Sequence, residues 1–118
     1  MENDAYGRCT NTMLRAFGVH VKEKVLDGLG VIHHLTEAGY VLDPMAPGNG
    51  FRYADYETTL NGEYRLGLKL GEFRKRFPVG CFYVGTRNHA MALIDGDLID
   101  TQGGTNRRRV EFAYRVTT

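Results

Sequence analysis

The sequence predicts an α+β fold in which N-terminal helices pack on a C-terminal antiparallel sheet. Apolar side chains recur with helical spacing in three segments before residue 78, and short apolar runs separated by tight turns follow from residue 81 onward. Helices followed by hairpin-connected strands are typical of α+β domains. Because 118 residues suffice for one domain with a core, we expect a single domain spanning 1–118.

The three predicted helices differ in the strength of their signals. Residues 9–17 have a short apolar face followed by a glycine stop. Residues 21–38 repeat apolar side chains every three or four positions, but glycines weaken this helix by about 1 kcal/mol each, so a break near Gly30 fits the pattern. Residues 69–77 form a basic helix that Pro78 ends, and we expect the sheet to pack against the first helix.

The remaining segments are predicted to be loops and strands. Residues 43–50 are rich in proline and glycine, which indicates a loop, and Asn61-Gly62 indicates a turn after a short strand within 51–60. The other expected strands are 81–86, 89–94, 97–101 and 110–116.

Composition excludes several classes of protein. Hydrophobic residues make up 42% of the chain and charged residues 25%, which is ordinary for a globular domain. The formal charge of +1 gives no reason to expect a nucleic-acid partner, and no apolar run reaches the roughly 20 residues of a membrane helix. Two cysteines and the absence of a signal-peptide pattern indicate a reducing, cytoplasmic location with no membrane partner.

Cys9 is the first candidate catalytic residue. It stands at the predicted start of a helix, and a helix N-terminus or a nearby imidazolium lowers the pKa of a thiol from its free value of about 8.5. The alternative for a lone cysteine before an apolar helix is a buried small residue. Cys81 lies in an apolar strand pattern, which indicates a structural residue rather than a nucleophile.

A histidine and a carboxylate follow on two adjacent predicted strands. The dipeptide Asp95-Gly96 is a preferred two-residue hairpin loop, and the register it sets pairs Met91 with Asp100. His89 and Asp100 then lie diagonally on one face, about 7 Å apart at the backbone, where the carboxylate could orient the imidazole. A longer loop would move Asp100 to the opposite face and make Gln102 the replacement. Cysteine, histidine and carboxylate together suit a thiol hydrolase.

Other kinds of site have weaker signals. Four histidines and two cysteines occur without the spacing of a metal site, so we expect no metal and no other cofactor. The basic run Arg107–Arg109 is interpreted either as a solvated loop or as a contact patch for an anionic partner.

Three stretches of the chain carry a family resemblance: Cys9 with the helix after it, residues 70–84, and residues 89–96 with Asp100. On these stretches the chain resembles small bacteriophage-encoded proteins regarded as papain-like cysteine peptidases and, more distantly, the leader peptidases of bacteriocin exporters. Residues 40–68 have no counterpart. The resemblance implies a papain-like fold and a viral protein that acts in the host cytoplasm.

The resemblance also implies roles for individual residues. Cys9 takes the position of the nucleophile, His89 that of the base and Asp100 that of the orienting acid. Asn3 stands where the leader peptidases have a glutamine of the oxyanion hole, and Arg8 replaces the usual acidic residue or glycine before the cysteine. The implied reaction is hydrolysis of a peptide or isopeptide bond in a peptide or protein, such as a host protein. The alternative is a non-catalytic papain-like binding module, for example a phage inhibitor of a host protein.

Overall fold

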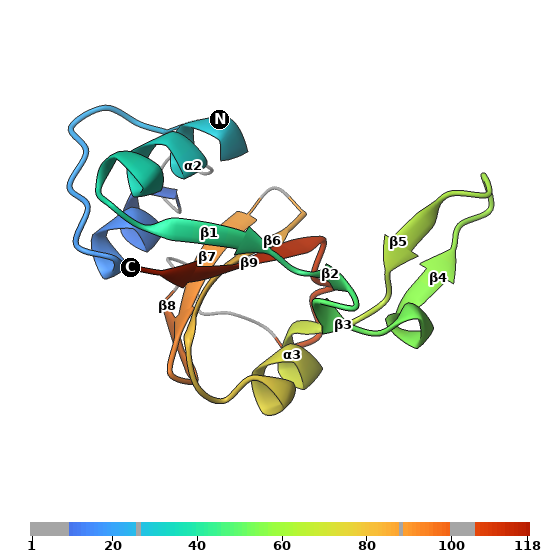
Figure 1. Ribbon diagram of the computed structural model, residues 1–118. Coiled ribbons are helices and arrows are strands. Elements are labelled where there is room, and N and C mark those ends of the chain that lie inside the picture. The colour runs from blue at the N-terminus through green and yellow to red at the C-terminus, as the bar shows by residue number, and fades with distance from the viewer. Residues whose placement is uncertain (1–9, 26, 88, 100–105) are drawn as a thin grey trace.

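Five strands form one sheet in the order β1-β9-β6-β7-β8 (Figure 1). The computed structural model describes residues 10–25, 27–87, 89–99 and 106–118. Each neighbouring pair in the sheet is antiparallel, which confirms the α+β class. The strands are β1 (Val41–Pro44), β6 (Cys81–Thr86), β7 (His89–Ile94), β8 (Asp97–Ile99) and β9 (Phe112–Thr117).

The hairpin that joins β7 to β8 has the predicted two-residue loop, Asp95-Gly96. Ile94 pairs with Asp97, and Ala92 pairs with Ile99. The two loop residues have φ angles of 47° and 87°, as a type I′ turn requires. The predicted register is therefore confirmed over the described residues of both strands.

Helix 10–16 corresponds to the first predicted helix, 9–17. It ends in a left-handed glycine, because Gly18 has a φ of 78°. The N–H of Val19 then donates to the carbonyl of Leu14 at 2.9 Å, which satisfies one of the carbonyls left open at the helix end.

The second helix, α2 (Gly28–Glu37), is shorter than the predicted helix 21–38. Its start is set by Asp27, whose carboxylate accepts a hydrogen bond from the N–H of Gly30 at 2.7 Å. Such an N-cap satisfies a backbone donor that has no partner inside the helix. The prediction was wrong for residues 21–25 and for Asp27, and the predicted break falls before the helix rather than within it.

Residues 21–25 are not helical because Asn11 uses the backbone groups that a helix would need. Its side chain donates to the carbonyls of Val21 and Glu23, at 3.5 and 3.0 Å, and accepts from the N–H of Val25 at 3.1 Å. In a helix, the Val21 carbonyl would accept from the Val25 N–H. Thr10 adds a hydrogen bond from its hydroxyl to the carbonyl of Val25.

The third helix, α3 (Leu70–Arg76), confirms the prediction over 69–77. The short strand expected within 51–60 is β4 (Tyr56–Thr58), and Asn61-Gly62 lies in the turn that follows it. A hairpin formed by β4 and β5 (Tyr64–Leu66) extends away from the sheet (Figure 1). A single turn of 3-10 helix, η1 (Tyr53–Asp55), precedes it.

The loop predicted over 43–50 is partly wrong. It contains the end of β1 and the short strands β2 (Ala46–Pro47) and β3 (Gly50–Phe51), which pair in parallel. β1 gives a weak local signal because it is an edge strand that pairs only with β9 and ends in Pro44. Proline is compatible with a strand at such an edge.

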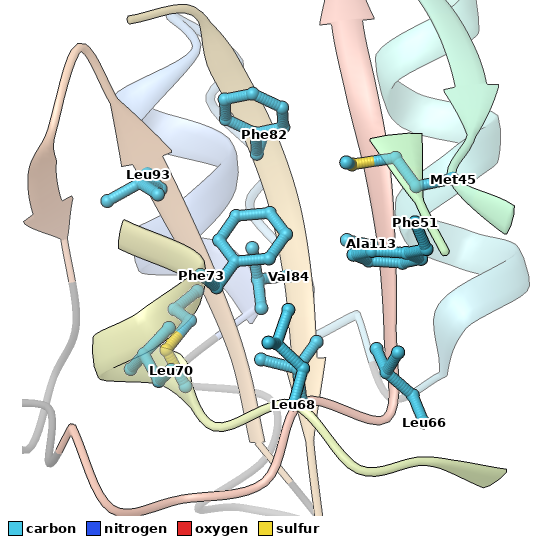
Figure 2. Close-up of a cluster of buried hydrophobic side chains, with 12 residues drawn as sticks. Met45, Phe51, Leu66, Leu68, Leu70, Phe73, Phe82, Val84, Leu93 and Ala113 are labelled. Atoms are coloured by element: carbon cyan, nitrogen blue, oxygen red, sulfur yellow. The ribbon is translucent and has the colours of Figure 1, made fainter. Parts of the chain in front are cut away.

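Two buried clusters lie on opposite faces of the sheet (Figure 1). One joins helix 10–16 and α2 to Tyr83, Ala90 and Ala92, so the first helix packs on the sheet as expected. The other joins α3 to side chains at alternate positions of β6 and β7. Figure 2 shows Phe73 of α3 beside Phe82 of β6, and their ring centroids are 5.4 Å apart. The second cluster comprises Met45, Phe51, Leu66, Leu68, Leu70, Phe73, Phe82, Val84, Met91, Leu93, Val110 and Ala113.

Candidate functional site

His89 is the candidate catalytic residue that the structure describes. It is the first residue of β7, is only 5% exposed, and pairs with Thr86 across the hairpin between β6 and β7. The other predicted site residues, Asn3, Cys9 and Asp100, lie outside the described residues, as does Gln102. A buried histidine at a strand end is consistent with a positioned imidazole, since burial fixes the ring.

The strand that leads to Asp100 is fixed against the strand that begins with His89. Ala92 pairs with Ile99 in the register expected from the tight turn. The predicted Met91–Asp100 pair is the next one along this register, and its second member, Asp100, lies outside the described residues. The hairpin geometry on which the carboxylate hypothesis depends is thus present over β8.

Helix 10–16, which directly follows Cys9 in the sequence, is anchored by buried contacts. Thr10, its first described residue, is fully buried and bonds the Val25 carbonyl through its hydroxyl. Met13 and Leu14 belong to the same buried cluster as the small side chains of β7. These small side chains are Ala90 and Ala92, which leave space for the helix to approach the sheet.

Alternation along β7 separates His89 from the helix-packed face. His89 and Met91 are two residues apart and so share a face, on which Met91 packs in the cluster of α3. Ala90 points to the opposite face, where helix 10–16 packs. A contact between His89 and a residue before Thr10 therefore has to be made around the end of β7.

Cys81 has the properties of a structural thiol. It is a free, half-buried cysteine at the start of β6 and packs against the cluster of helix 10–16. Burial raises the pKa of Cys81, and the carboxylate of Asp95 raises it further. Because the thiolate is the reactive form, Cys81 is a poor nucleophile near neutral pH.

The segment that carries Arg107–Arg109 is anchored through its backbone. The carbonyl of Arg108 accepts from the N–H of Leu70 at 2.8 Å, and Val110 donates to the carbonyl of Leu68 at 2.9 Å. The backbone of this predicted loop therefore lies along the start of α3, and these hydrogen bonds fix the positions from which its arginine side chains extend.

An arginine-lined cleft of about 410 Å³ lies beside the hairpin between β6 and β7. We call it the arginine cleft; its lining residues are Arg65, Thr86, Arg87, Arg108 and Arg109. The sequence interpretation singled out two of these residues through the basic run and missed the other three. No local motif could have found them, because they come from separate elements that only the tertiary fold brings together.

Neither a metal centre nor a membrane span is found in the part of the chain that the structure describes. Its histidines, cysteines and carboxylates form no group of three that could hold a metal ion. Within the same residues, no helix is long and apolar enough to cross a bilayer. Comparisons of the chain with protein-family models, curated proteins and solved structures give no match.

Proposed function

We propose that this protein is a papain-like cysteine hydrolase that cleaves a peptide or isopeptide bond in the cytoplasm, with Cys9, His89 and Asp100 as its catalytic residues. The observation that carries the proposal is the register of the β7–β8 hairpin, which begins at the buried His89 and matches the register that the Cys-His-Asp hypothesis requires. The packing of helix 10–16 on Ala90 and Ala92 supports it, because the helix that follows the nucleophile lies on the strand that carries the base.

The proposed reaction is an acyl transfer in two steps. Cys9 gives its proton to His89, and the sulfur adds to the carbonyl carbon of the substrate. His89 returns the proton to the leaving amine as the carbon–nitrogen bond breaks, which leaves a thioester on Cys9. Water, deprotonated by His89, then adds to the thioester. The carbon–sulfur bond breaks, the acid is released, and His89 returns the proton to the Cys9 sulfur. Asp100 orients His89, and Asn3 with the backbone N–H of Cys9 stabilises the oxyanion.

The second candidate is a binding module on the same scaffold, without catalysis. Two observations favour it: strand alternation directs His89 away from the face on which helix 10–16 packs, and the arginine cleft provides a charged contact surface. In this alternative, the partner is an acidic protein rather than a substrate.

Thiol reactivity distinguishes the two candidates. If Cys9 is paired with His89, iodoacetamide should label Cys9 at about pH 6.5 much faster than Cys81, whose pKa is raised. The His89→Ala variant should slow the labelling of Cys9 and leave that of Cys81 unchanged. Peptide mass spectrometry of the labelled protein reports both sites in one sample, so Cys81 is the internal control. Equally slow labelling of both cysteines in the native protein would rule out the catalytic candidate.

A further inference from the structure

The arginine cleft gathers positive charge from three separate parts of the fold. Arg65 comes from β5, Thr86 from the end of β6, Arg87 from the turn after it, and Arg108 and Arg109 from the segment before β9. Guanidinium groups repel one another unless anions lie between them. Their convergence on one hollow, in a chain with a formal charge of only +1, therefore indicates a site for an anion.

Described carboxylates neutralise only part of this charge. Arg65 pairs with Glu57 at 2.7 Å, and Arg109 pairs with Glu111 at 3.3 Å. Arg87 is exposed and forms no ion pair with any residue that the structure describes. The cleft therefore keeps at least one guanidinium for an incoming acidic group, and guanidinium binds carboxylates through two parallel hydrogen bonds.

Thr86 provides an independent observation at the same place. Its side chain is buried, with the residue 4% exposed, and its hydroxyl has no hydrogen-bond partner among the described residues. Buried hydroxyl groups in proteins are nearly always paired, and leaving one without a partner is unfavourable. Thr86 lines the cleft, but its hydroxyl oxygen is covered, so a bound carboxylate accepts the missing hydrogen bond only after the Thr86 side chain turns toward the cleft.

The cleft also lies next to the proposed catalytic base. Thr86 and His89 are directly opposed residues of β6 and β7. Directly opposed residues project from the same face, and their Cβ atoms are about 5 Å apart. An extended peptide advances about 3.4 Å per residue, so an acidic side chain in the cleft would lie within a few residues of a bond held at His89.

We propose that the arginine cleft binds an acidic side chain of a peptide substrate, so that the protein selects peptides with glutamate or aspartate near the bond it cleaves. This proposal rests on the proposed function, because the bound peptide is a substrate only if the protein cleaves it. Binding of the peptide in the cleft does not itself require catalysis. The main recognition contact is Arg87, and the Thr86 hydroxyl joins it once its side chain has turned toward the cleft. The neighbouring arginines add a positive field.

The test measures peptide binding with cleavage abolished. The Cys9→Ala variant is titrated into fluorescent octapeptides that contain Glu-Ala-Glu in a glycine–alanine background, and into matched peptides with Gln-Ala-Gln. We expect the glutamate peptide to bind at least about tenfold tighter, and Arg87→Gln to weaken it by about tenfold or more. Lys75→Gln, at an exposed position of α3, removes the same charge outside the cleft and is the matched control. Equal binding of the two peptides, or equal effects of Arg87→Gln and Lys75→Gln, would overturn the proposal.

A second variant separates recognition from folding. Thr86→Val replaces the hydroxyl with a methyl group of similar shape, so it should weaken binding of the glutamate peptide severalfold while the melting temperature stays unchanged or rises. A large fall in melting temperature would contradict the assignment of an unpaired hydroxyl.

Inorganic phosphate and a single-stranded oligonucleotide are titrated in parallel. Tighter binding of either than of the glutamate peptide would assign the cleft to phosphate groups instead. If the cleft binds the peptide but Cys9 is unreactive, only the proposed catalysis fails.

Discussion

Asp55 is a nearly buried carboxylate held between two arginines. It accepts two hydrogen bonds from the guanidinium of Arg76, at 2.7 and 3.1 Å, and one from the backbone N–H of Arg52 at 2.8 Å. The hydrogen bonds from Arg76 hold the pKa of Asp55 well below its usual value, and the bonds from Arg52 add to this effect, although burial opposes it. The contact joins η1, at the base of the β4–β5 hairpin, to α3.

We expect Asp55→Asn to reduce the free energy of unfolding at pH 7 by about 3 kcal/mol, because Arg76 loses its buried partner. Since the pKa is lowered in the folded state, the carboxylate stabilises the fold above the unfolded-state pKa of about 4, and this contribution is lost as the pH falls below it. The difference between parent and variant should therefore shrink in acid. Urea denaturation at several pH values measures it.

Glu57→Gln is the matched control for Asp55→Asn. Glu57 pairs with Arg65 at the same distance of 2.7 Å, but the side chains of both residues are about half exposed. An exposed pair contributes under about 1 kcal/mol. If the two variants lose equal stability, burial does not determine the strength of these ion pairs.

At the scale of the element, Asn11 acts as the connector between helix 10–16 and the segment before α2. Asn11→Ala removes the three hydrogen bonds to Val21, Glu23 and Val25, and we expect a loss of about 2 kcal/mol. Hydrogen exchange should rise first at the N–H of Val25. Thr12→Ala on the same helix is the control, because its side chain makes no hydrogen bond with the described residues and the substitution raises helix propensity as Asn11→Ala does. An equal loss in both variants would mean that the hydrogen bonds of Asn11 are not responsible.

A second element-scale contact joins β6 to β9 at Gly85. Gly85 pairs with Phe112, and a Cβ added at Gly85 would lie 2.1 Å from the Phe112 ring, so the ring covers the glycine. Gly85→Ala should force the ring aside and cost about 2 kcal/mol in thermal denaturation. In a Phe112→Ala background, the same substitution should cost much less. An unchanged cost in the double variant would locate the strain in the backbone instead.

Across the whole molecule, the sequence predicts features whose determinants are close together in the chain. The β7–β8 register follows from Asp95-Gly96 and the residues next to it. Residues 21–25 were wrongly predicted to be helical because Asn11, whose side chain takes up their backbone groups, lies outside that segment. β1 was missed because its partner β9 lies at the other end of the chain. The arginine cleft depends on such long-range contacts for all its members, so it became visible only in three dimensions.

The role of Cys9 in the whole protein is tested by measuring stability and activity of the same variant, Cys9→Ser. A catalytic cysteine must reach substrate, so Cys9→Ser should melt within about 3 °C of the parent. Peptide cleavage should nevertheless fall by orders of magnitude, because a serine hydroxyl is far harder to ionise than a thiol. Circular dichroism measures the melting temperature, and mass spectrometry of a glutamate-containing peptide library measures peptide cleavage.

A strongly destabilised Cys9→Ser protein would mean that the thiol is a packed structural group. A folded variant that keeps the full biological effect would mean that the scaffold acts by binding, and charge reversal at Arg107–Arg109 would then be the change expected to abolish that effect.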